Sequence, residues 1–315
     1  MLKIRLFGTG RAKYHDRSLV GFPHQRPALL LCYLLLNRRY PHSREHLAAT
    51  FWGDFPGWEA RKYLRNALWK LRQILQSAGA PPDEYLFISD GNVAFVSTSS
   101  YWLDVEAFEK AAACCQDLSV VEMSDAQAGE LENALQLYTG DLLESVYDDW
   151  CTYDRERLRL TYLSVLNKLL VCHAIRGNYE RSLSLGRLLL SLDNTLERVH
   201  RQVICLEWLS GNRSAALAQY KLCAQILNEE LGLQPMDTTK ELYERLLHHR
   251  VPSPEAMLHN YFIPHARIEL DPPTSLSKEL LEKLHDLQDT VEQTGQTLRQ
   301  LEGLISQYLL NAPRS

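Results

Sequence analysis

The stretch from Trp58 to Leu75, WEARKYLRNALWKLRQIL, constrains the fold more than any other part of this 315-residue sequence. On a helix of 3.6 residues per turn, its apolar residues fall on one stripe: Ala60, Leu64, Ala67, Leu68, Leu71 and Leu75. The opposite side carries Lys62, Arg65, Asn66, Trp69 and Gln73, and the flanks carry Arg61, Lys70 and Arg72. Glu59 is the only acidic residue in the stretch. The pattern therefore predicts an amphipathic helix with a basic exposed side.

The exposed side of this predicted helix has the chemistry of a DNA-reading surface. Arginine pairs with guanine edges and asparagine with adenine edges. A solvated face on a core helix is the alternative interpretation, and the neighbouring sequence favours DNA. Residues 43–52, SREHLAATFW, predict a second helix with Ser43 as its N-cap. Gly53, Pro56 and Gly57 then break the chain, so the order is helix, turn, basic helix, as in DNA-binding helix-turn-helix motifs.

Short strands are predicted around this helical pair. Residues 2–7, LKIRLF, alternate as a half-buried strand does, and residues 12–22 have room for two more short strands. An apolar helix is expected from Pro27, because a proline in the first turn loses no hydrogen bond. Residues 85–96, YLFISDGNVAFV, predict a hairpin, and a hairpin after a recognition helix is a wing. The predicted wing residues are Asp90, Gly91 and Asn92.

The charge of the chain is unevenly distributed. Residues 1–100 contain 14 Lys and Arg against 7 Asp and Glu, a net of +7. The remainder contains 20 against 32, a net of −12. The overall net charge of −5 therefore hides a basic module joined to an acidic one, and this asymmetry supports a DNA-binding N-terminal module.

Ordered blocks along the chain resemble one family of regulators. In the first hundred residues they are LKIRLFG at 2–8, SREHL at 43–47, FWGD at 51–54 and the spacing of Ala60, Arg61, Leu64, Arg65, Leu68, Leu71 and Arg72. Further along they are WLDV at 102–105 with Phe108, LYTGDLL at 137–143, Asp149, Trp150, Glu156, Arg157 and EELGLQP at 229–235. Together, over about residues 1–250, they resemble the Streptomyces antibiotic regulatory protein (SARP) family, in which an OmpR-type winged helix precedes a bacterial transcriptional activator domain.

The resemblance implies a sequence-specific transcriptional activator that binds direct repeats in double-stranded DNA near promoters. It also implies contact with the sigma or alpha subunit of RNA polymerase, through the loop at 52–57. The residues expected to face bases are Lys62, Arg65, Asn66 and Trp69, and those expected to contact phosphates are Arg44, Arg61, Lys70 and Arg72. Lys62 and Trp69 depart from the family pattern, so the family's base preference is not transferred.

Residues 101–250 are expected to be helical throughout. GNY at 177–179 and GNR at 211–213 interrupt the helical pattern with an offset of 34 residues, and Leu183 and Leu217 keep the same register. That offset is the period of tetratricopeptide (TPR) repeats, whose paired helices form a concave binding surface. The sequence thus predicts a TPR-like domain that receives a protein or small-molecule effector. A scaffold that only packs on the DNA-binding domain is the alternative.

The C-terminal segment has a different pattern. Five prolines at 251–275 predict a linker with little regular structure. Residues 276–312 then show a heptad seam, which predicts a coiled coil that makes a homodimer, or alternatively a helix folded back on the repeats. The predicted dimerisation residues are Leu280, Leu284, Leu287, Val291, Leu298, Leu301 and Ile305.

No motif for catalysis, metal binding or cofactor binding is recognised. His42 and His46 have a zinc-compatible spacing without a third ligand, and no phosphate-binding Gly-Lys-Ser/Thr loop occurs. We therefore predict a non-enzymatic protein without cofactors. Seven cysteines without a Cys-x-x-Cys pair, and no signal peptide, predict a cytoplasmic protein with reduced thiols. Two rivals stay open: a TPR-type interaction scaffold and a ligand-sensing regulator.

The predicted fold is therefore mainly α. It comprises a winged helix with small β-sheets at 1–100, an all-α TPR-like activator domain at 101–250, a proline-rich linker at 251–275 and a coiled-coil helix at 276–312.

Overall fold

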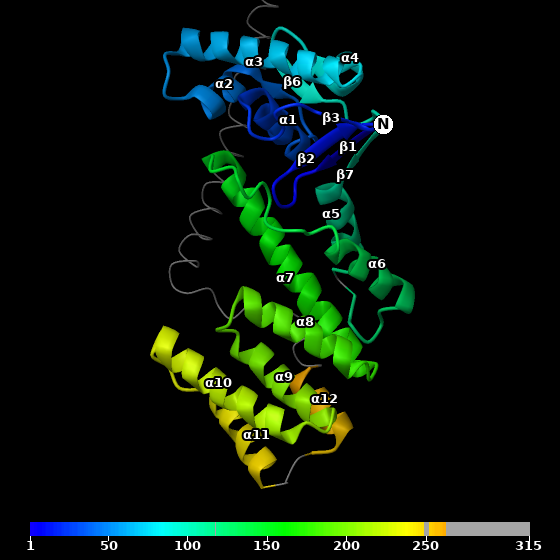
Figure 1. The fold of residues 1–315 in the computed structure, drawn as a ribbon, viewed down its shortest axis with the longest axis vertical. Coiled ribbons are helices and arrows are strands. Elements are labelled where there is room, and N and C mark those ends of the chain that lie inside the picture. Colours follow the sequence, from blue (N-terminus) through cyan, green and yellow to red (C-terminus); the bar gives the residue numbers. More distant parts are fainter. Residues whose placement is uncertain (117, 249–251, 263–315) are drawn as a thin grey trace, which may run out of the picture. The chain divides into compact units, whose positions relative to one another are not determined.

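The computed structural model describes residues 1–116, 118–248 and 252–262, which form a mainly helical fold with two small sheets (Figure 1). The strands are β1 (Leu2–Arg5), β2 (Arg11–Tyr14), β3 (Arg17–Ser18), β4 (His42–Ser43), β5 (Leu86–Ile88), β6 (Asn92–Phe95) and β7 (Tyr101–Leu103). The helices are α1 (Arg26–Leu36), α2 (Arg44–Trp52), α3 (Gly57–Ser77), α4 (Pro82–Tyr85), α5 (Asp104–Cys114), α6 (Asp125–Leu135), η1 (Asp149–Cys151), α7 (Thr152–Ile175), α8 (Tyr179–Leu192), α9 (Glu197–Leu209), α10 (Arg213–Leu231), α11 (Asp237–Leu247) and α12 (Pro254–Tyr261).

This order confirms the predicted fold class over the described residues. We call residues 1–103 the N-terminal module and residues 104–262 the helical domain. The predicted coiled coil at 276–312 and its seven dimerisation residues lie outside the described residues.

Two sheets frame the N-terminal module. The larger has the order β3-β2-β1-β7, in which β7 runs parallel to β1 and the other neighbours are antiparallel. The smaller has the order β4-β6-β5. Helix α1 forms the centre of the module because it is apolar on nearly every side, and its residues from Pro27 to Leu35 are all buried. Pro27 occupies the first turn of α1, as predicted.

A buried carboxylate joins the N-terminal module to the helical domain. Asp104, the first residue of α5, is only 1% exposed. It accepts hydrogen bonds from the backbone N–H groups of Leu6 and Phe7, at 2.9 and 3.1 Å, and of Val105, at 2.8 Å. Burial raises the pKa of the Asp104 carboxyl, and these hydrogen bonds oppose that rise. The side chain thus fixes the end of β1 against the start of α5.

The loop between α6 and η1 forms a second connection between the two parts. Leu143 N donates to Leu6 O at 2.8 Å, and Gly8 N donates to Asp141 O at 2.9 Å. Arg155 of α7 holds this loop, because its guanidinium donates to three of the loop's backbone carbonyls at 2.6–3.0 Å. The loop therefore extends the pairing of β1 with a segment more than 130 residues away in sequence.

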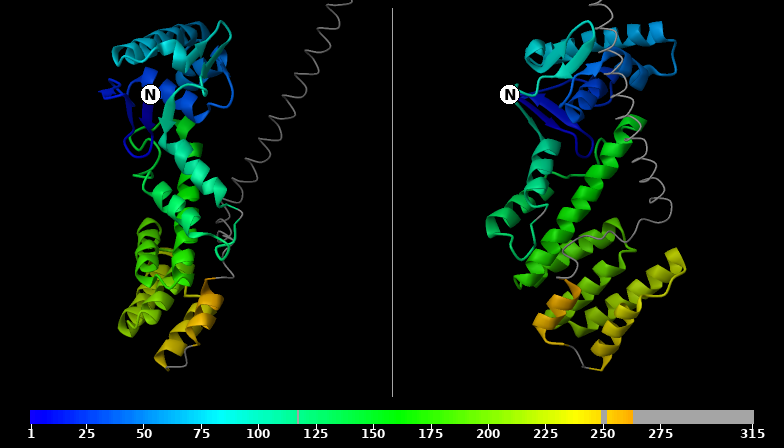
Figure 2. Two further views of the ribbon diagram at one scale, coloured as in Figure 1. Left: turned by 90° about the vertical axis from the view of Figure 1, so that its right-hand side faces the viewer. Right: turned by 180° about the vertical axis from the view of Figure 1, so that it is seen from behind.

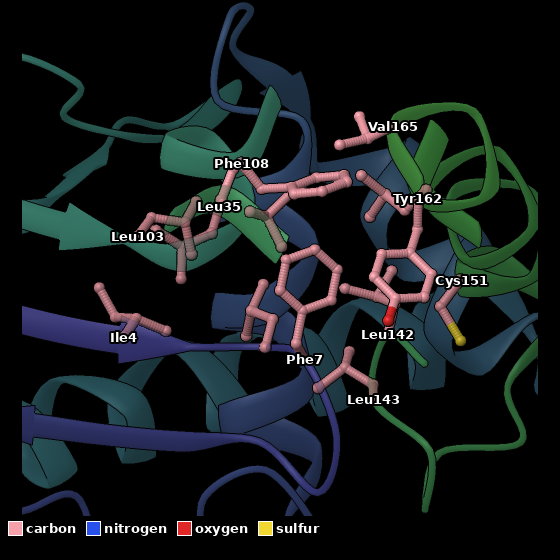
Figure 3. Close-up of a cluster of buried hydrophobic side chains, with 14 of the residues drawn as sticks. Ile4, Phe7, Leu35, Leu103, Phe108, Leu142, Leu143, Cys151, Tyr162 and Val165 are labelled. Carbon is pink, nitrogen blue, oxygen red and sulfur yellow. The ribbon is translucent and has the colours of Figure 1, made fainter. Parts of the chain in front are cut away.

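A continuous hydrophobic core fills this junction (Figure 3). Phe7 contacts Phe108 edge to face, with ring centroids 5.5 Å apart, and lies beside Leu142 and Tyr162. Tyr138 stacks on Tyr162 with ring centroids 4.0 Å apart. Aromatic residues from α5, α7, the loop and the segment that follows β1 thus bury one another, which is the main stabilisation available to such a surface.

Helices α7 to α10 form two antiparallel pairs (Figure 2). The turns that end α7 and α9 have the same geometry: Gly177 and Gly211 have φ of +76° and +81°. The N–H groups of Asn178 and Asn212 each donate at 2.8 Å to the carbonyl five residues earlier. Because glycine adopts positive φ without strain, it is the residue that suits both turns. The predicted 34-residue period is therefore confirmed as a repeat of helix pairs.

The predicted proline-rich linker is wrong at its start, because Pro254–Tyr261 form helix α12. Pro254 occupies the first turn, where it favours a helix, and Ser253 caps the N–H of Ala256. Met257 and Phe262 are fully buried, and α12 packs on α9. Residues 263–275 of that predicted linker lie outside the described residues.

The expectation of an all-helical chain from residue 101 is wrong for residues 101–103. These residues form β7, because they pair with β1 from Leu2 to Ile4. Strand pairing between distant segments overrides local preference here.

One helical segment among the described residues, Asp149–Ile175, is long and apolar enough in composition to cross a membrane. Of its most apolar window, 56% is buried inside the protein, as in a core helix. This is weak evidence for a membrane span.

We predict that Asp104→Ala lowers the free energy of unfolding by about 3–5 kcal/mol, since three buried N–H groups lose their acceptor. Denaturant unfolding of the full chain, followed by circular dichroism, measures this change. Asp54→Ala, at an exposed carboxylate, serves as the control and should change stability by less than about 0.5 kcal/mol. Equal stability of the two variants would contradict the role given to Asp104.

We also predict that part of the stability of the repeats depends on pH through His200. This side chain is 1% exposed and lies 2.8 Å from Asn194 O and 2.7 Å from Gln219 Nε2. Burial lowers the pKa of His200. The unfolded chain therefore binds a proton at His200 more readily than the folded chain does. The stability that neutral His200 contributes above pH 6.5, its ordinary pKa, is lost as the pH falls.

The measurement is the difference in unfolding free energy between the natural chain and His200→Gln, from pH 8 to pH 5. This difference should shrink below pH 6.5, the ordinary value for histidine. Cys205→Ala, on the same helix and fully buried, should lower stability equally at every pH in this range. A difference for His200→Gln that stays constant with pH would exclude this contribution.

Candidate nucleic-acid interface

Helix α3 buries the stripe that the sequence predicts to be apolar and exposes the predicted basic side. Its six buried residues are the predicted apolar stripe: Ala60, Leu64, Ala67, Leu68, Leu71 and Leu75. All four predicted base-facing residues are exposed: Lys62, Arg65, Asn66 and Trp69. Arg65 and Asn66 lie three and four residues after Lys62, and Trp69 lies four and three residues after them, so the four side chains form a single strip along the helix. Trp69 is 61% exposed, which is unusual for a large apolar side chain without a partner.

The single acidic residue of α3 does not interrupt this strip. Glu59 accepts a hydrogen bond of 2.6 Å from the hydroxyl of Tyr63, on the flank of the helix. The ring of Tyr63 in turn contacts Phe55 edge to face, with ring centroids 5.0 Å apart. These contacts attach the start of α3 to the α2–α3 turn.

The predicted phosphate-contacting residues differ in their surroundings. Arg61 and Lys70 are exposed on the two flanks of the strip. Arg72 is partly buried and forms an ion pair of 2.7 Å with Asp83 of α4, which lowers the net charge that it offers. Arg44 is also partly buried, and it supports the wing. The structure therefore brings two of the four cations to the exposed surface beside the strip without a carboxylate partner among the described residues.

The wing is fastened to the helix-turn-helix at its turn. Strands β5 and β6 form the predicted hairpin around Asp90 and Gly91, and Ser89 N donates to Asn92 O at 2.9 Å. At the same turn, Arg44 N donates to Gly91 O at 3.0 Å and Arg44 Nε to Ser89 O at 2.9 Å. The first residue of α2 thus fixes the position of the wing tip. The tip itself carries one acidic and no basic side chain.

Helix α2 is capped and supported in the predicted way. Ser43 Oγ accepts a hydrogen bond of 3.1 Å from His46 N, which confirms Ser43 as the N-cap. His46 Nε2 lies 2.9 Å from the Tyr33 hydroxyl, and His42 Nε2 lies 3.0 Å from Asn37 O. Both imidazoles therefore contact protein groups. Among the described residues, no group of three or more His, Cys, Asp or Glu side chains is arranged to hold a metal ion.

Sequence reasoning missed the residues that orient the N-terminal module on the helical domain. Trp150 of η1 contacts the rings of Tyr33 and Phe51, each with centroids 5.6 Å apart. Arg26 forms an ion pair with Asp148. Asp148 and Trp150 lie where a helix begins, and no local pattern indicates partners 99 to 122 residues earlier in the chain.

A cavity of about 720 Å³ lies at the same junction and includes residues of α5 and α7. Most of its charged side chains pair with one another. Arg38 lies 3.5 Å from Glu106 and 3.8 Å from Glu109, and Arg157 lies 2.8 Å from Glu109. These pairs link the N-terminal module to α5 and α7, so the paired charges of this cavity have a structural explanation.

Comparison with known proteins gives a consistent result. Residues 103–247 match the family model described as the bacterial transcriptional activator domain. The chain is 27% identical over 255 residues to the regulatory protein AfsR of Streptomyces coelicolor, a match that covers 78% of this chain and 24% of AfsR. It is 24% identical over 229 residues to the transcriptional regulatory protein MoaR1 of Mycobacterium tuberculosis, covering 72% of this chain and 73% of MoaR1.

A solved structure shares the fold. Mycobacterium tuberculosis EmbR, in complex with a low-affinity phosphopeptide, superposes with a TM-score of 0.62 at 20% identity. The match covers 82% of this chain and 69% of EmbR. The chain spans about a quarter of the length of the AfsR proteins that it matches.

Proposed function

We propose that this chain is a transcriptional regulator of the SARP family and, more specifically, a sequence-specific DNA-binding activator. The exposed strip on α3 carries the proposal. It combines Lys62, Arg65, Asn66 and Trp69 on a helix that follows a capped helix and a turn, with a wing fastened beside it. A major groove admits such a helix, and these side chains suit guanine, adenine and thymine edges.

We assign direct base contacts to the strip and phosphate contacts to its flanks. Arg61 and Lys70 would bind phosphates on either side of the groove, which positions the helix without reading sequence. Arg72 would contribute less, because Asp83 already pairs with it. Asp90 places a negative charge at the wing tip, so the wing would contact the minor groove edge through Asn92 and backbone groups.

The α2–α3 turn supports contact with RNA polymerase. Phe55 and Trp58 are 45% and 65% exposed there, beside the proposed DNA surface, and exposed aromatic residues are common at protein interfaces. We further propose a cytoplasmic, non-enzymatic protein that binds direct repeats, and a homodimer formed through the heptad segment. The sigma or alpha subunit would be the polymerase partner.

The two rival functions have less support. A scaffold without DNA binding leaves the basic strip and the exposed Trp69 unexplained. A small-molecule effector would need a site, and the 720 Å³ cavity at the junction has most of its charges paired internally. DNA binding is therefore the function that the described surfaces favour.

We predict that Arg65→Ala loses about 1–3 kcal/mol of affinity for a duplex selected by the full chain, because one paired base contact disappears. Its sequence preference should relax at one position. Lys70→Ala should instead weaken binding to all duplexes similarly and reduce the salt dependence of binding. Fluorescence anisotropy at several salt concentrations measures both effects.

Lys221→Ala is the matched control, since Lys221 is an exposed lysine on α10, outside the proposed interface. It should leave affinity and salt dependence unchanged. Unchanged binding of Arg65→Ala to the selected duplex would refute the proposed orientation of α3.

We also predict that Trp69 recognises thymine through its 5-methyl group, an apolar feature of the major groove. Replacing thymines of the selected duplex one at a time by deoxyuridine should cost the natural chain about 1 kcal/mol at one position. Trp69→Ala should be insensitive to that replacement, whereas Trp58→Ala should keep the sensitivity. A natural chain that binds every substituted duplex equally well would exclude this contact.

A further inference from the structure

The outer face of the larger N-terminal sheet carries a second concentration of positive charge. Strand alternation places Leu2 and Ile4 in the core and leaves the alternate side chains outside. The exposed cations on this side are Lys3 and Arg5 of β1 and Arg11 and Lys13 of β2. With Trp102 of β7 they form what we call the basic sheet face.

The strand register sets like charges directly against one another. Lys3 lies opposite Lys13, and Arg5 lies opposite Arg11. Like charges at directly opposed positions destabilise a sheet. Within the part of the chain that the structure describes, none of these four cations has an ion-pair partner. The array therefore costs stability and is not neutralised from within the fold.

Trp102 adds an aromatic ring at the β7 side of this charged face. It lies opposite Lys3 in the parallel β1–β7 pair, with the Lys3 ammonium 5.1 Å and the Arg5 guanidinium 5.9 Å from its ring. Cation–π contacts of this kind hold long side chains over the ring without removing their charge. A ligand that binds here would meet ordered cations beside an aromatic surface.

The basic sheet face is separate from the proposed DNA surface. Figure 1 shows α1 between α3 and strands β1 and β2. The other side of β1 faces the core, where Ile4 lies near Leu35 of α1 (Figure 3). A duplex bound along α3 would thus lie on the far side of α1 from Lys3 and Lys13.

We propose that the basic sheet face binds an extended, acidic segment of a partner protein. Lys3 and Arg5 are two residues apart on a strand, which separates them by about 6.7 Å. Alternate side chains of any extended peptide have the same separation, so carboxylates at every second position would meet the cations in register. This pairing relieves the repulsion between β1 and β2, and Trp102 adds apolar contact at the edge of the peptide.

The test uses the full chain and a labelled peptide of alternating glutamate and threonine, with a glutamine–threonine peptide as the uncharged control. Anisotropy should show binding of the acidic peptide alone. The double variant Lys3→Thr with Lys13→Thr should weaken that binding by about tenfold or more, as expected for two lost charge-assisted contacts. The variant should also melt at the same or a higher temperature, because a repulsive pair is gone.

Lys221→Thr, an exposed lysine on α10, is the control and should leave peptide binding unchanged. The selected DNA duplex should bind the double variant with unchanged affinity and salt dependence. Weaker DNA binding with a reduced salt dependence would instead make this face a phosphate contact and overturn the proposal. Failure of the natural chain to bind the acidic peptide would also overturn it.

A second copy of this chain is the remaining occupant to exclude. Light scattering should give the same mass for the natural chain and the double variant. A mass that falls only in the double variant would show self-association through this face and overturn the proposal. The result is separable from the proposed function, because Arg65→Ala should weaken duplex binding and leave peptide binding intact.

Discussion

The relation of the N-terminal module to the helical domain depends on the Asp104 carboxylate. A buried carboxylate is costly unless hydrogen-bond donors surround it. Here the backbone N–H groups of Leu6 and Phe7, almost a hundred residues earlier in the chain, and of the adjacent Val105 do so. Leu6 and Phe7 continue β1 beyond its last paired residue, and their N–H groups would otherwise be buried without acceptors. One side chain thus satisfies the end of a strand and starts a helix. The packing of Phe7 against Phe108 and Tyr138 follows from that position.

Charged side chains are arranged differently at this junction and on the outer surfaces of the N-terminal module. The junction pairs many of its charges, as Arg157 does with Glu109 and Asp154. The N-terminal module instead leaves cations exposed in two places, along α3 and on the outer side of the larger sheet. Unpaired exposed charge contributes little to stability, and where charges of one sign are concentrated on one surface they favour the binding of ions of the opposite sign. The +7 of the first hundred residues is therefore concentrated on surfaces that are free to meet anions.

The features that the sequence predicts are those determined by neighbours along the chain. The buried stripe of α3 follows from its 3.6-residue period, the wing from Asp90 and Gly91, and the repeat from two glycine turns 34 residues apart. The features that it misses depend on distant partners. Asp104 contacts residues 97 and 98 positions earlier, and α12 is stable because Met257 and Phe262 are buried beneath it. Exposure of the strip on α3 was predictable, whereas the ion pair between α3 and α4 was not.

The pairing of β1 with both β7 and the loop near Leu142 has a consequence for how such regulators diversify. Recombination that exchanged the first hundred residues for those of a relative would separate β1 from β7 and leave the Phe7 contacts mismatched. The exchange would succeed only where both sides of the junction had diverged together. Under the proposed function, new DNA specificities are therefore expected to arise by substitution on the exposed side of α3, with the N-terminal module and the helical domain inherited as one unit.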